Sequence, residues 1–94
     1  MIYLKSPIIL IAMGNRLRDI RKKKAMTQGD VADKAGIAVS QVGRIERGKL
    51  NPSISTIFVI ALAMDIEPKD LFDFEEVFVR KKTEGKKRNK KSSL

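Results

Sequence analysis

The sequence predicts an all-α domain, a compact bundle of five helices. Apolar residues recur at spacings of three and four, which is typical of amphipathic helices. A length of 94 residues is enough for one hydrophobic core and too short for two. Residues that start or stop helices stand between the apolar segments, namely Thr27, Gly36, Gly48 and Ser53.

The first two helices are predicted over residues 14–24 and 28–35. Asn15 and Thr27 are their expected caps, and Gly36 ends the second helix. Asp30 stands in the first turn of the second helix, where a negative charge is favourable. The residues expected on the inner sides are Met13, Leu17, Ile20, Val31, Ala32 and Ala35.

A third helix is predicted over residues 38–47, ending at Gly48 where a left-handed backbone is usually needed. On a helical wheel its inward side holds Val39, Val42, Ile45 and Glu46. Its outward side is polar and basic, with Ser40, Arg44 and Arg47 flanked by Gln41 and Gly43. Such a helix is either an ordinary amphipathic surface helix or one that offers donors and acceptors to DNA bases.

A fourth helix is predicted over residues 53–65, capped by Ser53 and apolar on almost every side. Such a helix belongs at the centre of a bundle or at a subunit contact. The residues assigned to its inner side are Ile54, Ile57, Phe58 and Ala61, and those that fall away from that side are Val59, Ile60 and Ala63.

A short fifth helix is predicted to begin near Glu67, with Pro68 at its first position. Leu71 and Phe72 are expected to turn inward from it. Residues 74–80 fit either a continuation of this helix or a strand that pairs with the N-terminal apolar segment.

The net charge of +9 is unevenly distributed, since residues 80–94 carry +7 and the rest of the chain only +2. This tail has almost no apolar residues and is expected to be disordered. It either adds sequence-independent attraction to phosphates or solubilises the terminus. The predicted organisation is an apolar extension over residues 1–12, a domain over residues 13–79 and the basic tail over residues 80–94. The extension is either a dimerisation strand or of little consequence.

The composition disfavours enzyme chemistry. Cysteine and histidine are both absent, which removes thiolate nucleophiles, sulfur ligands and the commonest general base. The spaced acids Asp30 with Asp33 and Asp70 with Asp73 fit solvated faces and helix-dipole charges better than a metal or acid–base pair. We therefore expect no enzyme, no metal and no cofactor. The apolar run after Pro7 is too short for an export signal or a membrane span, which predicts a cytoplasmic protein without membrane contact.

Glu46 lies beside the apolar positions of the third helix, where an unpaired carboxylate is costly. On the same wheel Arg21 lies about 40° from the direction of Leu17, so it also points partly inward. We expect a bidentate ion pair between Arg21 and Glu46 that ties the first helix to the far end of the third.

Residues 15–72 resemble the Xre/Cro type of helix-turn-helix repressors of bacteria and phages. The matching residues are Leu17, Arg21, Thr27, Gln28, Val31, Ala32, Gly36, Val42, Ile45, Glu46, Arg47, Gly48, Pro52 and the segment EPKDLF at 67–72. This ordered set at the family's spacing is specific. The resemblance implies a lambda-repressor-like bundle of five helices that binds double-stranded DNA as a homodimer on a near-palindromic operator. In such proteins the third helix enters the major groove, and half-sites lie about 34 Å apart.

The resemblance places base-reading residues at Val39, Ser40 and Arg44, with Gln41 close by. Arg44 can fork onto guanine and Ser40 can donate or accept, whereas Val39 either presses on a thymine methyl or belongs to the edge of the core. The residues at the family's phosphate-contacting places are Gln28, Lys49, Asn51, Ser53 and Ser55, and Arg47 is a further candidate.

Three residues depart from the family pattern. Ala38 stands where a Ser or Thr cap is common, at a cost of about 1 kcal/mol. Gly29 and Gly43 lie inside predicted helices, each at a cost of about 0.5–1 kcal/mol relative to alanine. Gly43 either permits a close approach to DNA or merely weakens its helix.

The sequence thus predicts a dimeric, sequence-specific transcriptional regulator. Repression is favoured because a small DNA-binding domain without an effector domain acts mainly by occupying a promoter. The alternative is an antitoxin-like or phage-regulatory module that binds a protein partner as well as DNA. Its support is the apolar surplus at residues 8–10 and 77–79 and in the fourth helix, which a dimer interface explains equally well.

Overall fold

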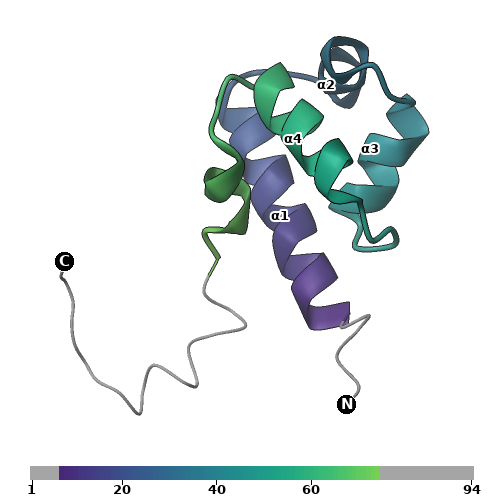
Figure 1. Cartoon of the computed structure of the whole chain (residues 1–94), viewed down its shortest axis with the longest axis vertical. Helices are drawn as coiled ribbons and strands as arrows, with labels where there is room; N and C mark the ends of the chain where they lie inside the picture. Colours follow the sequence, from purple (N-terminus) through teal and green to yellow (C-terminus); the bar gives the residue numbers. More distant parts are fainter. Residues whose placement is uncertain (1–6, 75–94) are drawn as a thin grey trace, which may run out of the picture.

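The computed structural model describes residues 7–74, and within them the chain forms four α-helices and one 3-10 helix (Figure 1). The elements are α1 (Pro7–Lys23), α2 (Gln28–Ala35), α3 (Val39–Glu46), α4 (Ile54–Ala63) and η1 (Pro68–Phe72). This part of the chain contains no strand. The predicted all-α class is confirmed, and the fifth element of the bundle is a 3-10 helix.

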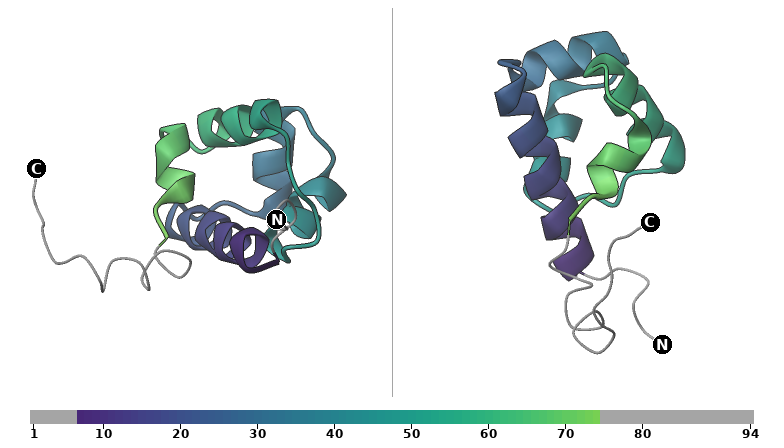
Figure 2. Two further views of the ribbon diagram at one scale, coloured as in Figure 1. Left: turned by 60° about the horizontal axis from the view of Figure 1, so that its bottom comes forward. Right: turned by 90° about the vertical axis from the view of Figure 1, so that its left-hand side faces the viewer.

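The five elements close into a ring around one core. α1 packs against α3 and η1, α2 packs against α3 and α4, and α4 packs against η1. The left view of Figure 2 shows this ring, with α1 and α4 on opposite sides of it. Because each element has two neighbours in the ring, a change in the position of one helix must be absorbed by the others.

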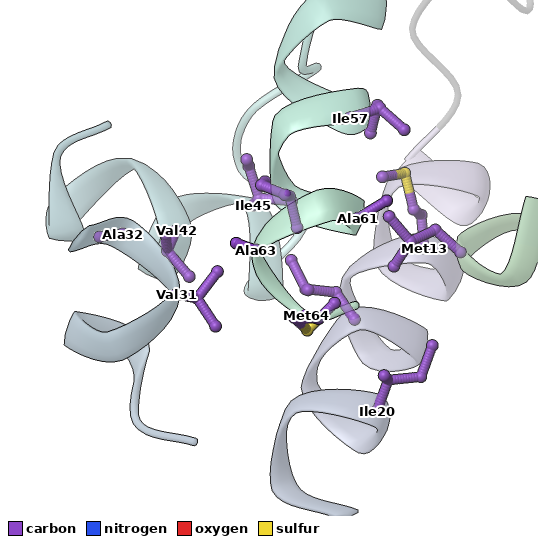
Figure 3. Close-up of a cluster of buried hydrophobic side chains, with 13 residues drawn as sticks. Met13, Ile20, Val31, Ala32, Val42, Ile45, Ile57, Ala61, Ala63 and Met64 are labelled. Atoms are coloured by element: carbon purple, nitrogen blue, oxygen red, sulfur yellow. The ribbon is translucent and has the colours of Figure 1, made fainter. Parts of the chain in front are cut away.

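Each of the five elements contributes a fully buried side chain to the core. Leu17 comes from α1, Val31 from α2, Ile45 from α3, Ile60 from α4 and Leu71 from η1. Burial of one such side chain stabilises the fold by about 1.5–3 kcal/mol. The whole cluster, drawn in Figure 3, consists of Met13, Leu17, Ile20, Val31, Ala32, Val42, Ile45, Ile57, Ile60, Ala61, Ala63, Met64 and Leu71.

Local capping interactions fix the ends of α2. The Thr27 hydroxyl accepts a hydrogen bond from the Asp30 amide at 2.9 Å, and the Asp30 carboxylate accepts one from the Thr27 amide at 2.9 Å. The hydrogen bond with the Thr27 backbone lowers the pKa of Asp30 most, and the hydrogen bond with the Thr27 side chain lowers it further. Gly36 then ends the helix with a left-handed φ of 73°. The predicted start and stop of this helix are therefore confirmed.

The ends of α3 and α4 also follow the sequence signals. α3 begins after Ala38, whose side chain makes no capping hydrogen bond, and the chain turns at Gly48 with a φ of 72°. Ser53 caps α4 by accepting a hydrogen bond from the Thr56 amide at 3.1 Å.

The predicted start of the first helix is wrong, because α1 begins at Pro7 and crosses the expected boundary after residue 12. Asn15 lies inside this helix and is not its cap. The additional N-terminal turns of α1 are stabilised because Ala12 and Met13 are buried against the rest of the bundle. A strand pairing through residues 7–12 is therefore excluded. The expectations for residues 1–6 and for 75–94, including the basic tail, lie outside the described residues.

Two predicted orientations are also wrong. In α4, Ile54 and Phe58 were expected to face inward but are 69% and 50% exposed, whereas Ile60 is buried. In η1, Phe72 is 46% exposed and only Leu71 turns into the core. Both segments have apolar residues on several sides, so their hydrophobic pattern does not define a single inward direction.

α1 and α3 meet with their backbones in contact. A Cβ atom on Gly14 would lie 2.4 Å from the carbonyl oxygen of Ile45 and 2.6 Å from that of Glu46. At Gly48 a Cβ atom would lie 2.8 Å from Cγ1 of Ile11. The absence of side chains at these two glycines lets the N-terminal half of α1 lie directly on the end of α3.

We predict that Gly14→Ala lowers the free energy of unfolding by about 2–3 kcal/mol, because backbone atoms must move to admit the methyl group. The matched control is Gly29→Ala, where a Cβ would meet only the Thr27 hydroxyl at an ordinary 3.6 Å. That change is expected to stabilise α2 by about 0.5–1 kcal/mol. Urea unfolding of both variants with unchanged m-values measures the two effects, and equal signs would contradict the packing argument.

Candidate nucleic-acid interface

α2 and α3 are joined by a short turn that contains Gly36, and α3 presents one side to solvent. Ser40 and Arg44 are exposed and Gln41 is half-buried, whereas Val42 and Ile45 on the other side are buried. This pairing of two helices around a glycine turn, with the second helix open on its polar side, is a helix-turn-helix arrangement.

Val39 lies outside the core, with 51% of its surface exposed. The helical wheel had assigned it to the inward side together with Glu46. As the first residue of α3 it lies beyond the reach of the elements that cover Val42 and Ile45. A methyl-bearing side chain at this place can contact a thymine methyl group.

The residues expected to contact phosphate lie at the start of α2 and in the segment that runs from the end of α3 to the start of α4. Gln28 is half-buried at the first position of α2, and Arg47 is exposed directly after α3. Lys49, Asn51, Ser53 and Ser55 are all exposed in the following loop and the start of α4. The hydroxyl of Ser53 is engaged with Thr56 in the cap of α4.

Arg21 and Glu46 form a bidentate ion pair between α1 and α3. Arg21 Nε donates to Glu46 Oε2 at 2.5 Å, and Arg21 Nη2 donates to Glu46 Oε1 at 3.0 Å. Only 9% of Arg21 and 2% of Glu46 are exposed. Arg21 Nη1 also donates to the carbonyl oxygen of Met26 at 2.9 Å, so the guanidinium is satisfied on several sides.

Glu46 has two further partners that the sequence analysis missed. Gln28 Nε2 donates to Glu46 Oε1 at 2.9 Å, and Arg18 Nε lies 3.6 Å from the same oxygen. The spacing of three between Arg18 and Arg21 indicates that both lie on one side of α1, which was the available signal. Glu46 thus joins α1, α2 and α3 through one carboxylate.

These contacts set the ionisation of the pair. Burial by itself would raise the pKa of Glu46, but the hydrogen bonds from Arg21 and Gln28 and the charges of Arg21 and Arg18 outweigh it and lower that pKa. The hydrogen bond to Glu46 raises the pKa of Arg21 against the opposing effect of burial. The pair is therefore fully charged at neutral pH.

Neither a metal cluster nor a membrane helix is found within residues 7–74. No group of three or more acidic side chains there is placed to hold a metal ion. None of the helices is long and apolar enough to span a bilayer.

The family model described as Helix-turn-helix (HTH_3) matches residues 17–71 of this chain. This match covers more than half of the chain and contains α2, α3 and α4 completely. The protein is therefore a member of this helix-turn-helix family.

Individual relatives agree with this assignment. The chain is 31% identical over 81 residues to the immunity repressor protein of Bacillus phage phi105, a match that spans 86% of this chain and 56% of the relative. It is 34% identical over 70 residues to the control protein C.BamHI of Bacillus amyloliquefaciens, covering 73% of this chain and 86% of that protein. The chain thus spans little more than half the length of the phage repressor and most of the control protein.

A solved structure gives the same result. The restriction-modification controller protein C.AhdI from Aeromonas hydrophila matches with a TM-score of 0.66 and 43% sequence identity. The match covers 67% of this chain and 96% of the controller protein. The similarity therefore extends over nearly the whole fold of that protein.

We predict that Glu46→Ala lowers the free energy of unfolding by about 3 kcal/mol at neutral pH, because it leaves Arg21 buried without its partner. Since folding lowers the pKa of Glu46, its stabilisation is complete above the unfolded value of about 4.3 and is lost as the pH falls through the lower folded value. The difference between wild type and variant should therefore shrink on acidification below about pH 4.

Denaturant unfolding at a series of pH values measures this difference. The control Asp19→Ala removes an exposed carboxylate from α1 and is expected to change stability by less than about 0.5 kcal/mol. A difference between wild type and Glu46→Ala that stays constant down to pH 2 would show that the carboxylate charge plays no part.

Proposed function

We propose that this protein is a sequence-specific repressor that binds double-stranded DNA as a homodimer, with α3 of each subunit in the major groove. Its family makes it a DNA-binding transcriptional regulator. Repression, the homodimer, the near-palindromic operator and the use of the groove are parts of the proposal. The naming of one relative as an immunity repressor supports the first of these. The function calls for no cofactor, and the site of action is the compartment that holds the DNA, which we expect to be the cytoplasm.

One observation carries the proposal: Ser40 and Arg44 are exposed on one side of α3, while Glu46 holds its other side through the buried ion pair with Arg21. A helix fixed in this way keeps its polar side chains on a rigid support. Rigid presentation favours base contacts because the side chains lose less freedom when they bind.

We assign base reading to Val39, Ser40, Gln41 and Arg44. Arg44 carries most of the discrimination, because its guanidinium can donate to both O6 and N7 of guanine. Ser40 and Gln41 each have a donor and an acceptor, and Val39 offers an apolar contact to thymine.

We assign phosphate contact to residues at the start of α2 and after the end of α3, which set the register of the helix without reading sequence. Gln28 stands at the N-terminus of α2, where backbone amides and the helix dipole favour an anion. The other assigned residues are Arg47, Lys49, Asn51, Ser53 and Ser55.

The exposed side of α4 supports the homodimer. Ile54, Phe58 and Leu62 are spaced by four residues and are 69%, 50% and 74% exposed, so they form an apolar stripe. α4 contains no charged residue. In a two-fold contact each patch meets its own copy, so a charged patch on this strongly basic chain would repel itself, whereas the uncharged stripe does not. We therefore place the second copy on this stripe.

The assignment of base and phosphate contacts predicts different effects for Arg44→Ala and Lys49→Ala. After selection of an operator from random DNA, Arg44→Ala should cost about 1–3 kcal/mol of discrimination at one base position. Lys49→Ala should weaken matched and scrambled duplexes alike and reduce the slope of log K against log salt by about 1. Binding titrations at several salt concentrations distinguish these outcomes, with Lys23→Ala on α1 as the control. Equal losses from both changes on both duplexes would contradict the assigned roles.

The dimer predicts that Leu62→Asp yields monomers. Because a two-fold interface uses the same surface of both subunits, it would contain two copies of the aspartate in place of leucine. Dimerisation should therefore weaken by about 3–5 kcal/mol. Leu62 is mostly exposed, so the fold itself should be unaffected. Sedimentation velocity measures the change, and the control is Ile8→Asp, which removes a 62% exposed apolar residue of α1. A Leu62→Asp protein that remains dimeric would place the interface elsewhere.

The second candidate function is a module that binds another protein as well as DNA. The same stripe of Ile54, Phe58 and Leu62 favours it, because an exposed apolar stripe also suits a different partner. Light scattering after size exclusion separates the two: a stable homodimer that exposes no apolar surface to a hydrophobic dye argues against an obligatory second protein.

A further inference from the structure

We propose that Ile11, in the N-terminal half of α1, positions the loop between α3 and α4 for DNA binding. Its side chain packs on Gly48 near the start of that loop, residues 47–53. The contact restricts the conformation from which Lys49 and Asn51 meet the DNA. Ile11 is thus a positioning residue that acts through the loop. The inference rests on the proposed function, because that function assigns the two loop residues to the DNA backbone.

The contact between α1 and the loop involves three atoms of Ile11. A Cβ atom on Gly48 would lie 2.8 Å from Cγ1, 3.1 Å from Cα and 3.2 Å from the backbone nitrogen of Ile11. Gly48 also has a left-handed φ of 72°, which glycine adopts without strain. The start of the loop is therefore set by the backbone conformation of Gly48 and by the side chain that covers it.

The rest of the loop depends on packing. The amides of Gly48 and Lys49 donate to carbonyl oxygens in the last turn of α3, at 3.0 and 2.9 Å. Within residues 7–74, the backbone of residues 50–52 forms no hydrogen bond with another backbone group. Leu50 is half-buried against the core. Packing at Gly48 and at Leu50 therefore holds this part of the chain, and the first of these contacts comes from Ile11.

This contact lies outside the part of the chain that the family model matches. The match begins at residue 17, whereas Ile11 lies in the turns of α1 that precede it. Residues 7–15 carry no charge, so this end of α1 adds packing to the loop and no charge of its own to the DNA surface. Its contribution is therefore the order of the loop.

An ordered loop favours binding, because its freedom is lost on folding and not on association with DNA. Lys49 and Asn51 are both exposed, so they can meet phosphates in the conformation that the loop already has. Without the Ile11 side chain, the loop would have to become ordered when DNA binds. That cost falls equally on every duplex, since phosphate contacts do not read sequence.

The first test measures the loop in the absence of DNA. Ile11→Ala removes Cγ1 and Ile11→Val keeps it, and neither should unfold α1, because Ile11 is 49% exposed. Backbone NMR order parameters of residues 49–51 should fall from about 0.85 in the wild type to below about 0.6 in Ile11→Ala, and Ile11→Val should keep the wild-type values. The matched control is Ile8→Ala, which truncates a 62% exposed residue in the first turn of α1. Unchanged order parameters in Ile11→Ala, or an equal fall in Ile8→Ala, would overturn the inference.

The second test measures DNA binding at a temperature where circular dichroism shows every variant to be folded. Ile11→Ala should weaken binding about fivefold on matched and scrambled duplexes alike, whereas Ile11→Val and Ile8→Ala should bind as wild type does. In a background that carries both Lys49→Ala and Asn51→Ala, Ile11→Ala should add no further loss, because the loop side chains no longer contribute. A loss that persists in that background, or that falls on the matched duplex alone, overturns the role of the loop.

Two results distinguish failure of this inference from failure of the proposed function. A wild-type protein that selects no duplex from a random DNA pool removes the proposed function, and the measurement without DNA then still decides whether Ile11 orders the loop. A wild type that binds its operator, together with an Ile11→Ala protein that binds equally well, removes only the role of Ile11.

Discussion

The position of α3 depends on the buried carboxylate of Glu46. A charge with 2% exposure is tolerated only when it is paired and hydrogen-bonded, and Glu46 receives donors from Arg21 on α1 and Gln28 on α2. These bonds have strict geometry, so they hold α3 at one angle to the bundle. The close contact of Gly14 with the same end of α3 adds a steric limit to the electrostatic one. Three helices thus meet at one residue, and the polar side of α3 is oriented as a result.

The helix that is held in this way is weak by itself. α3 has eight residues, starts without a side-chain cap at Ala38 and contains Gly43. Isolated helices of this length are unstable in water, so α3 is stabilised mainly by the packing of Val42 and Ile45. The closed ring of elements provides that packing from one side only. The opposite side, with Ser40 and Arg44, therefore remains exposed to solvent.

The local sequence was most informative where a residue has one clear physical role. Thr27 and Gly36 define α2 because capping and a left-handed turn depend on neighbouring residues alone. The sequence was least informative where apolar residues stand on several sides. The apolar run of residues 8–12 has no polar side that marks it as helical, so the N-terminal half of α1 was missed. The same lack of contrast led to the wrong inward side for α4, where Ile54 and Phe58 are exposed.

The sequence by itself determined the helical class, the turn between α2 and α3, and the partnership of an inward Glu46 with an inward Arg21. These features follow from residue type and helical spacing, which act over a few positions. Only the tertiary structure decided that Gln28 also binds Glu46 and that Gly14 lies against the end of α3. Such contacts join residues that are far apart in the chain, and they depend on the crossing of helices to within about an ångström, which no local pattern specifies.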